Sequence, residues 1–477
     1  MRRPLFAPLA LVLSTLVCPS ALSDCTLKNS PYAFEPAGGN RPAKFGPGFT
    51  NDLDLYQGSG GERRLLVMEN YGYATFSLAN PAAPSILGYS DMSMTVPQVG
   101  DGQSIIVSLA AAPDGARALV NWKQSPYGTF LMKPNSVNFS FAGNFAGFRA
   151  IGGVVVDPLP TRSIAYALTT AGLYVSDVSS FVSGTSATQA GSLASQVVGS
   201  APTGSLVHHL TRAGHFIVYA VGSLVVVVDG STPGDPTSIP RGLSVRTIPG
   251  TAFGLGATDF VTNVAAVLHP VTGRLLIAAE GTPPTSSSST GIGLVSSADG
   301  VTFRSEGPPF HVGSPYGAFT MPAFTMTATD KDVLTFAWEG APNGKYKLVT
   351  LSYAGWGEGT DLSDVVVDPS SLPAFALPTR MRAFASGGDV YGYVAAQQGG
   401  VALALACTTV YAVGDADGDG ALTVGDVFGL INYLFAAGAA PIGSGDVDGD
   451  RNVTVQDVFA LVNYLFSGGA PPVTAVQ

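Results

Sequence analysis

The chain has 477 residues, which is enough for two to four domains. Hydrophobic residues make up 46% of it and charged residues 12%, a composition that excludes intrinsic disorder and allows a large core. The net charge of −10 argues against binding nucleic acid by phosphate neutralisation. Beyond the first 25 residues no apolar run approaches the roughly 18 residues of a membrane-spanning helix, so we expect no transmembrane segment.

Residues 1–23 have the pattern of a secretory signal peptide. Arg2 and Arg3 precede an apolar stretch from Leu5 to Val17. Ala21-Leu22-Ser23 places small residues at the two cleavage positions, which would make Asp24 the first mature residue. Cys18 raises the alternative of a lipid-anchored protein, but Val17 stands before it where a small residue is expected. We therefore expect a secreted, extracellular protein, attached to the cell surface only through a partner.

Residues 24–412 are predicted to form an all-β domain. Short apolar runs alternate with turns rich in Gly, Pro, Asn and Asp, and long amphipathic helix patterns are lacking. The clearest predicted strands are Arg64–Glu69, Ala118–Trp122, Phe216–Val221, Leu224–Asp229, Arg274–Ala279, Val333–Trp338 and Lys347–Tyr353.

Coarse repeats recur in this region about every 45–55 residues. A strand, a glycine turn, a second strand and a polar or Pro-containing turn occur at Leu65–Gly88, Ala165–Ser180 and Phe216–Pro236, with the hairpin turns at Gly72, Gly172 and Gly222. These segments resemble the repeats of LVIVD-type β-propellers. With the segments at 103–141, 275–303, 333–353 and 390–411, which fit by hairpin rhythm, the resemblance implies about seven blades. Six or eight blades, or a stacked pair of β-sandwiches, are the alternatives.

Two cysteines remain after signal cleavage, Cys25 and Cys407, at the two ends of the β region. Export is compatible with a disulfide. In a propeller the ring closes when the N-terminal segment joins the last blade, which would make the two cysteines neighbours. Two free buried thiols are the alternative interpretation.

The β region carries no strong catalytic pattern. His208 and His209 are adjacent, so on one strand they would point to opposite faces and could not readily share a metal. Ser205 and Asp229 lie near them in sequence, but no Gly-x-Ser-x-Gly elbow surrounds Ser205. We assign no catalytic residue here.

Glycosidases need paired carboxylates, and a few acidic residues lie beside aromatic or acidic neighbours. The candidates are Glu339 after Trp338, Glu358 after Trp356, Asp361 with Asp364, Asp52 with Asp54, and Asp330 with Asp332. The two tryptophans are expected to be packing residues and most of the aspartates to lie at turns and strand ends. Ser297–Phe303 resembles the Asp-box turn of sialidase-like propellers, but it is one residue short and occurs once; an Asp-Gly hairpin turn is the expected structure.

Residues 413–477 hold eight aspartates and one arginine, and they contain a duplication. Gly414–Gly438 and Gly445–Gly469 share 16 of 25 residues at an offset of 31. Carboxylates at loop positions 1, 3, 5 and 12 with a carbonyl at position 7 can enclose one Ca²⁺. We therefore predict two calcium loops, 415–426 and 446–457. The ligands are Asp415, Asp417, Asp419, Ala421 and Asp426 in the first loop and Asp446, Asp448, Asp450, Asn452 and Asp457 in the second.

A helix is predicted after each loop. Apolar residues recur at helical spacing, and Gly438 and Gly468 are the expected ends of the helices. Position 8 of each loop, Leu422 or Val453, is expected to anchor the loop in the core. The apolar residues are Val427, Leu430, Ile431, Leu434 and Phe435 in the first helix and Val458, Leu461, Val462, Leu465 and Phe466 in the second.

The duplicated segment resembles the type I dockerin domain, a pair of EF-hand-like calcium loops each followed by a helix. The resemblance implies docking onto a cohesin module of a scaffold or cell surface. The segment departs from the pattern in two ways. Arg451 occupies position 6 of loop two, where glycine normally makes the sharp turn. Val424-Gly425 and Val455-Gln456 replace the usual hydroxyl residues at positions 10 and 11. Loop two is therefore expected to bind calcium more weakly, and the partner is a cohesin-like module or the protein's own propeller.

These features favour a secreted, non-catalytic propeller that binds a protein or glycan and is tethered through its dockerin. The alternative is an extracellular glycoside hydrolase that takes part in polysaccharide degradation, with the dockerin as its assembly module. It rests only on what dockerin-bearing proteins commonly do. A structural surface protein is the third interpretation.

Overall fold

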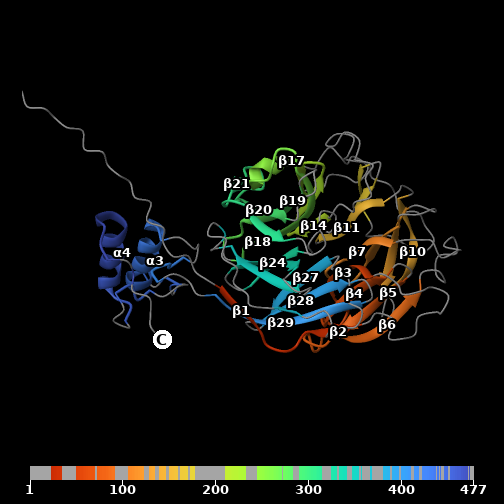
Figure 1. Cartoon of the computed structure of the whole chain (residues 1–477), viewed down its shortest axis with the longest axis horizontal. Coiled ribbons are helices and arrows are strands. Elements are labelled where there is room, and N and C mark those ends of the chain that lie inside the picture. Colours follow the sequence, from red (N-terminus) through yellow and green to blue (C-terminus); the bar gives the residue numbers. More distant parts are fainter. Residues whose placement is uncertain are drawn as a thin grey trace, which may run out of the picture. The chain divides into compact units, whose positions relative to one another are not determined.

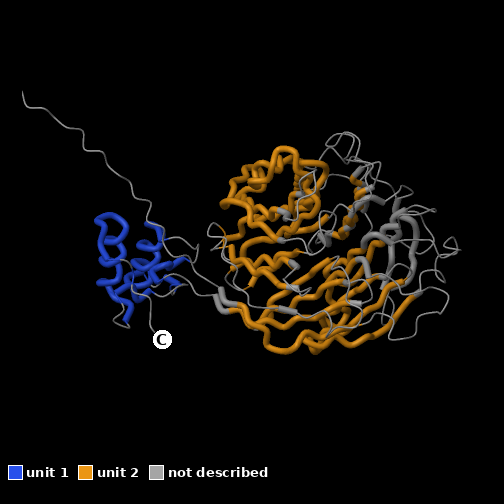
Figure 2. Tube along the Cα trace, in the orientation of Figure 1, with its two compact units in different colours: residues 1–22, 410–477 blue, residues 23–409 orange. Residues whose placement is uncertain are grey.

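The computed structural model divides the chain into two compact units (Figure 2), one of residues 23–409 and the other of residues 1–22 with 410–477. The first is called the body and the part of the second from residue 413 onward the C-terminal unit. The boundary lies close to the expected domain start at residue 413. The structure describes residues 23–34, 50–69, 72–91, 106–122, 128–134, 139–146, 150–159, 162–169, 172–177, 210–231, 244–270, 272–282, 289–313, 324–329, 332–340, 346–353, 356, 366–367, 380–386, 389–396, 399–409, 413–417, 422–436, 438–439, 441, 445–448, 452–470 and 472.

The described strands of the body form seven antiparallel sheets. The first three sheets contain β3 (Thr50–Gln57), β4 (Arg63–Glu69), β5 (Gly72–Ser77) and β6 (Ser85–Asp91); β7 (Ile106–Ala111), β8 (Ala118–Trp122), β9 (Gly128–Pro134) and β10 (Phe139–Ala146); and β11 (Ala150–Leu159), β12 (Arg162–Thr169) and β13 (Gly172–Asp177). The fourth and fifth contain β14 (Leu210–Ala213), β15 (Phe216–Val221), β16 (Leu224–Asp229) and β17 (Ser244–Pro249); and β18 (Phe260–Leu268), β19 (Leu275–Thr282), β20 (Ser289–Ser297), β21 (Arg304–Ser305) and β22 (Phe310–Gly313). The sixth contains β23 (Phe324–Ala328), β24 (Val333–Gly340), β25 (Tyr346–Ser352) and β26 (Val366–Val367), and the seventh contains β27 (Arg380–Ser386), β28 (Asp389–Ala396), β29 (Gly399–Thr409), β1 (Ser23–Leu27) and β2 (Tyr32–Phe34).

The sheets are arranged in a ring (Figure 1). The first strand of each sheet contacts the first strands of both neighbouring sheets, from β3 through β7, β11, β14, β18 and β23 to β27 and back to β3. A closed ring of antiparallel sheets is the architecture of a β-propeller. The predicted mainly β, propeller-like fold is confirmed, and the alternative of two stacked sandwiches is wrong.

The strands in the middle of each sheet are buried on both faces, which explains their continuous apolar sequences. In β15 the side chains of Ile217 and Tyr219 pack toward the preceding sheet, whereas Val218 and Ala220 pack toward the following one. All six residues of β15 are buried, and each fully buried aliphatic side chain contributes about 1.5–3 kcal/mol. The core of the body is therefore a series of layers between adjacent sheets.

The N-terminal strand closes the ring. β1 pairs with β29 in antiparallel register and places Cys25 opposite Cys407. The two form a disulfide, so the predicted bridge is confirmed and the free-thiol alternative is wrong. β1 begins at Ser23, next to the expected cleavage site; residues 1–22 lie outside the described ranges.

Several predicted strands have the observed bounds. Ala118–Trp122, Phe216–Val221 and Leu224–Asp229 match β8, β15 and β16, and the others shift by a few residues. Gly222 makes the predicted turn with φ 59°, a conformation that favours glycine. Gly72 and Gly172 instead are the first residues of β5 and β13.

The C-terminal unit contains two helices among its described residues, α3 (Val424–Phe435) and α4 (Val455–Ser467). Their inner faces form a small core that includes Leu430 and Leu461. Leu422 and Val453 pack against this core, as predicted. Phe435 and Phe466, grouped by spacing with the core residues, are instead 69% and 68% exposed. Both lie on the side of the helix that carries the exposed Phe428 or Phe459, whereas the adjacent Leu434 and Leu465 pack against the core.

The helix ends agree with the glycine signals. Gly468 is the C-cap of α4 with φ 68°, and the N–H of Gly438 bonds to the carbonyl of Asn432 beyond the end of α3. In the part of the chain that the structure describes, no helix has the length and apolar character needed to cross a membrane.

Candidate functional site

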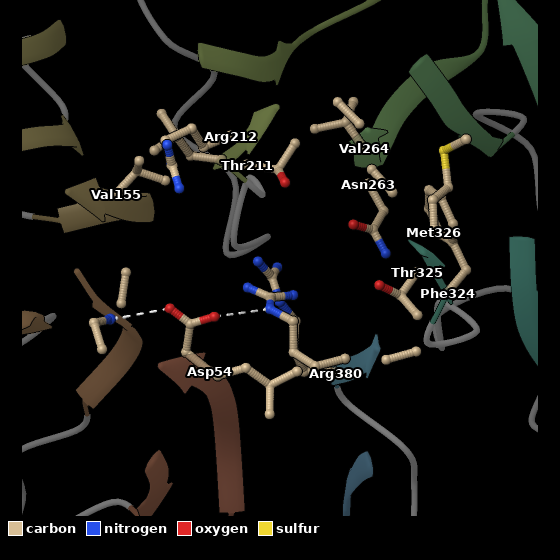
Figure 3. A pocket seen from close by; sticks show the side chains of 18 of the residues that line it. Asp54, Val155, Thr211, Arg212, Asn263, Val264, Phe324, Thr325, Met326 and Arg380 are labelled. Atoms are coloured by element: carbon tan, nitrogen blue, oxygen red, sulfur yellow. Dashed lines mark hydrogen bonds and ion pairs between the residues drawn. The ribbon is translucent and has the colours of Figure 1, made fainter. Parts of the chain in front are cut away.

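The centre of the ring holds a cavity of about 210 Å³. The first strand of every sheet contributes to its lining: β3, β7, β11, β14, β18, β23 and β27. Apolar side chains form much of the wall, and a few polar and charged groups face the space (Figure 3). This central cavity is the first candidate site.

Two parallel ion pairs join β3 to β27 beside the cavity. Asp52 and Asp54 alternate along β3, and Arg380 and Arg382 alternate along β27, so each pair of like residues shares one face of its strand. The Arg380 Nε atom lies 3.2 Å from Asp52 Oδ1. The Arg382 Nε atom lies 3.1 Å from Asp54 Oδ1 and donates a hydrogen bond to it.

The same aspartates also hold the next strand of the ring. Asp52 Oδ2 accepts a hydrogen bond from the backbone N–H of Leu109 at 3.0 Å, and Asp54 Oδ2 accepts one from Ala111 at 3.0 Å. The two carboxylates therefore connect β27, β3 and β7. The expectation that such close aspartates lie at turns or strand ends is wrong here, because they lie inside β3 and neutralise arginines of the neighbouring sheet. Asp332, beside its turn at the start of β24, agrees with that expectation.

Arg380 is the most deeply buried cation of this group, at 6% exposure. Burial lowers the pKa of Arg380 to about 10, and the charge of Arg382 acts in the same direction, while Asp52 and Asp54 oppose both. Arg380 is still a cation at neutral pH, and its Nε atom makes no hydrogen bond within the described residues despite the ion-pair contact. Because that Nε atom is itself buried against Asp52, a ligand in the cavity would meet Arg380 through its terminal guanidinium nitrogens.

Polar side chains also line the wall of the cavity that lies opposite Arg380 (Figure 3). Asn263 on β18 and Thr325 on β23 are 4% and 6% exposed, and Thr211 and Arg212 on β14 line the same space. The register of β18 against β19 shifts between Val261 and Asn263. Such a bulge re-aims a side chain, which accounts for the Asn263 amide pointing into the cavity from a mostly apolar strand.

The polar side chains of this lining are mainly hydrogen-bond donors. Among the described lining residues Asp54 is the single carboxylate, and it is held by Arg382 and a backbone N–H. Acid–base cleavage of a glycosidic bond needs two carboxylates. The lining instead offers guanidinium, amide and hydroxyl groups, which recognise oxygen atoms of a ligand.

The C-terminal unit contains the second candidate site, in two copies. Asp415, Asp417 and Asp426 offer oxygens that all lie within 4.8 Å of one another, and Asp446, Asp448 and Asp457 do the same. Asp415, Asp426 and Asp457 are fully buried. The structure thus brings together three predicted ligands of each loop. Asn452 is described and exposed, whereas Asp419, Ala421 and Asp450 lie outside the described residues.

Each cluster is built into the start of a helix. Thr423 caps α3, and Asp426 completes the capping box by accepting the N–H of Thr423 at 2.7 Å. The other oxygen of Asp426 accepts the N–H groups of Ala416 and Asp417, at 2.8 and 3.2 Å. Thr454 and Asp457 repeat this arrangement at α4 with Val447 and Asp448. One aspartate therefore closes each loop onto its helix.

The outer faces of the two helices carry matching exposed apolar residues. Val424, Phe428 and Phe435 of α3 are 51%, 61% and 69% exposed. Their spacing of four and seven residues puts them on one helix face. The equivalent residues of α4 are also exposed: Val455, Phe459 and Phe466. We call these six residues the apolar helix faces.

The other residues that the sequence analysis named as possible catalytic or sugar-binding groups have structural roles where the structure describes them. Trp338 and Trp356 are buried packing residues in two inter-sheet clusters. Asp229 lies 3.5 Å from His215 in a partly exposed pair. The remaining candidates lie outside the part of the chain that the structure describes: the side chain of Glu339 and residues 205, 208, 209, 330, 358, 361 and 364.

The Asp-box-like segment forms a turn. Hydrogen bonds from the N–H groups of Thr302 and Val301 and from the hydroxyl of Ser297 lower the pKa of Asp299 to about 2. Gly300 has φ 69°, as a tight turn requires. The expected Asp-Gly hairpin turn is thus the structural role of this segment.

Sequence reasoning missed Arg380, Arg382, Asn263 and Thr325 as cavity residues. A signal was present for the arginines: Asp-Leu-Asp at 52–54 and Arg-Met-Arg at 380–382 are complementary i, i+2 charge patterns in strand segments, one near each end of the β region. No comparable signal marks Asn263 or Thr325, because a single polar residue in a strand does not reveal which face it occupies.

The closed ring of antiparallel sheets around a central cavity places the body in the β-propeller class. No protein-family model matches the chain, and no curated protein matches it. Among solved structures it is similar to Raptor from Chaetomium thermophilum, with 10% identity over 82% of this chain and 29% of that chain and a TM-score of 0.45. It is also similar to the RRP9 WD40 repeats, with 12% identity over 81% and 99% of the two chains and a TM-score of 0.46. A third similar structure is the hydrazine synthase of Kuenenia stuttgartiensis, with 10% identity over 76% and 97% of the chains and a TM-score of 0.44. No function follows from similarity at this level.

Proposed function

We propose that this chain is a secreted, calcium-binding dockerin protein whose body is a seven-bladed β-propeller that binds a protein or a glycan. The C-terminal unit tethers the body to a cohesin-like module of a scaffold or cell surface. The observation that carries the proposal is the pair of carboxylate clusters, each closed onto the start of a helix by a capping-box aspartate. The signal sequence and the Cys25–Cys407 disulfide support export.

The clusters fit calcium in donor type and in size. Every donor is an oxygen, which Ca²⁺ prefers, and two oxygens on opposite sides of one Ca²⁺ are about 5 Å apart because each Ca–O bond is about 2.5 Å. One carboxylate oxygen from each of the three aspartates in a cluster lies within 4.8 Å of the other two. Bringing three such charges together is unfavourable without a cation, since residues 413–477 contain a single basic residue, Arg451.

The apolar helix faces support a protein partner for the C-terminal unit. Exposed phenylalanines at equivalent positions of two helices give the unit two similar apolar surfaces. Aromatic residues are enriched in protein interfaces, and contiguous exposed apolar patches mark interaction sites. This surface suits a cohesin-like module in place of the hydroxyl contacts missing at loop positions 10 and 11.

The body supports recognition more than hydrolysis. Seven described sheets form the closed ring, which supports seven blades, and the central cavity offers one carboxylate that is already ion-paired. A reducing-sugar assay on plant and bacterial polysaccharides separates the two functions. No released sugar is expected, and release that is lost in a carboxylate variant would establish the glycoside hydrolase instead.

Titration calorimetry with calcium tests the central claim. The chain from Asp24 to Gln477 should bind two Ca²⁺ ions. Asp415→Asn with Asp417→Asn should leave one, because both substitutions remove ligand charge and leave the capping box of α3 intact. Thr423→Ala is the control: it removes the cap of the same helix and none of the carboxylates, so two ions should still bind. Unchanged stoichiometry in the double variant would contradict the assignment.

The two loops should differ in affinity. Arg451→Gly restores the residue that makes the sharp turn at position 6, so it should tighten the weaker of the two sites by about tenfold. The same titration measures this change. A variant in which both affinities stay as in the parent chain would show that Arg451 does not weaken loop two.

A further inference from the structure

The described lining of the central cavity holds more basic than acidic side chains. Arg212, Arg380 and Arg382 line it together with one aspartate, Asp54, whereas the whole chain has a net charge of −10. Arg382 is directed to Asp54, and Arg212 Nη1 donates to the carbonyl of Gly214. Arg380 has its ion-pair contact with Asp52 and an Nε atom without a hydrogen bond. Counted together with Asp52 and Asp54, the three arginines leave a net charge of +1, so the lining favours an anion of low charge.

Opposite Arg380 the cavity offers groups that both donate and accept hydrogen bonds. The amide of Asn263 and the hydroxyl of Thr325 point toward the same space as Arg380, and Thr211 faces it from β14 (Figure 3). Asn263 and Thr325 are more than nine-tenths buried, and neither side chain bonds to another residue within the described ranges. Amide and hydroxyl groups match the hydroxyls of a ligand, which also donate and accept.

The size of the cavity limits the ligand. Drug-sized ligands occupy pockets of about 300–1,000 Å³, and this cavity measures about 210 Å³. It fits a single small molecule or one terminal residue of a larger one. Its walls between the polar groups are apolar, with Val264 and Met326 among them, so the weakly polar face of a sugar ring would lie against them.

We propose that the central cavity binds a small hydroxylated carboxylate of the sugar-acid class, such as a hexuronate, with its carboxylate on Arg380 and its hydroxyls on Asn263, Thr325 and Thr211. A guanidinium and a carboxylate form charge-assisted hydrogen bonds about twice as strong as neutral ones. A phosphate, which carries more charge, is disfavoured by Asp54. The inference rests on the proposed role of the body as a recognition module and names the ligand class of that module.

Titration calorimetry of the calcium-loaded chain from Asp24 to Gln477 tests the inference with three probes: sodium D-glucuronate, D-glucose and inorganic phosphate. Glucuronate should bind at least tenfold more tightly than either of the others. Equal binding of glucose would overturn the role of charge, equal binding of phosphate would overturn the sugar-acid class, and no binding of glucuronate would overturn the proposal as a whole.

Two variants place the ligand in the cavity. Asn263→Asp keeps the side-chain shape and adds a carboxylate opposite Arg380, so it should weaken glucuronate binding at least tenfold. Thr325→Val removes one hydroxyl and should weaken it about threefold or more. Thr327→Val is the matched control, since Thr327 lies on the same strand at 7% exposure and outside the cavity lining. Equal effects of the two threonine variants would overturn the placement of the ligand in the cavity. If Asn263→Asp does not fold, the comparison of the two threonine variants is the test.

A glycan array with the same protein separates this inference from the function on which it rests. Binding of neutral glycans without binding of glucuronate would overturn the sugar-acid class and leave the recognition function in place. An absence of binding to any glycan, together with failure to capture protein ligands on a peptide array, would count against both.

Discussion

The body and the C-terminal unit both bury aspartates, but they neutralise them in different ways. In the body, Asp52 is 3% exposed and lies against Arg380 of the neighbouring sheet. In the C-terminal unit, Asp415, Asp426 and Asp457 are fully buried, and residues 413–477 contain one arginine and no lysine. A buried charge is costly unless it is paired or coordinates a metal. The body therefore carries its cations within the fold, whereas the C-terminal unit holds Asp426 and Asp457 with backbone N–H groups and, under the proposed calcium binding, takes its cations from solution.

The largest expected effect is the selective loss of the C-terminal unit when calcium is removed. At a calcium concentration 1,000 times the dissociation constant, each bound ion would add about 4 kcal/mol of stability. Hydrogen exchange with and without a chelator should show α3 and α4 losing protection, while β15 and β16 keep theirs. Protection of α3 and α4 that does not depend on calcium would break the comparison, because the buried aspartates would then be neutralised without a metal.

The second-largest expected effect comes from breaking the buried ion pair between Asp52 and Arg380. Asp52→Asn leaves Arg380 buried without its anion, and breaking one partner of a buried pair costs about 3–5 kcal/mol. Urea unfolding of the body should show this loss. Asp389→Asn is the matched control, since its pair with Lys28 is partly exposed and such pairs contribute about 0–1 kcal/mol. Similar losses in the two variants would show that burial of the Asp52 pair is unimportant.

The disulfide should contribute about as much to the stability of the body as the Asp52–Arg380 ion pair, or somewhat less. It joins residues 382 positions apart and holds β1 on β29. Removing a native disulfide typically costs about 2–5 kcal/mol, because the unfolded chain gains freedom. Cys25→Ser with Cys407→Ser should lower the urea midpoint of the body and leave calcium binding by the C-terminal unit unchanged. An unchanged midpoint would mean that the β1–β29 pairing closes the ring without help from the bridge.

The sequence was informative wherever a local pattern determines local structure. The glycine turn at Gly222 and the bounds of β15 and β16 could be predicted because turn chemistry and apolar runs are local signals. The meeting of Cys25 and Cys407 followed from ring closure. The cavity could not be predicted, because it is assembled from seven strands far apart in the chain and a polar residue such as Asn263 is aimed by a bulge that depends on its partner strand.

The C-terminal unit shows the same limit on a smaller scale. Its loops repeat a pattern dense enough to predict which carboxylates meet. Helical spacing alone, however, grouped Phe435 with the core residues, although it lies at the edge of the apolar stripe toward Phe428 and is exposed, while the adjacent Leu434 packs on the core. Periodicity gives the apolar side of a helix, and tertiary structure sets how wide a part of that side is buried.

The smallest expected effect is a pH response of the body that involves no aspartate. His269 is buried, and its Nδ1 atom accepts a hydrogen bond from the N–H of Thr272 at 3.2 Å. Burial and the charge of Arg274 lower the pKa of His269 below its ordinary value of 6.5. Below pH 6.5 the unfolded chain therefore binds the proton more readily than the folded one. The stability is complete above that pH and falls as the pH drops through the folded pKa.

The expected loss is about 1 kcal/mol between pH 7 and pH 5, the value of one hydrogen bond that needs the neutral ring. His269→Asn should flatten this part of the profile, since the amide oxygen still accepts from Thr272 and does not titrate. His311→Asn, at an exposed position on β22, should leave the profile as it is. Urea unfolding at a series of pH values measures all three proteins. A His269→Asn profile with the parent's slope would show that the buried charges of the body, and not this histidine, set its response to acid.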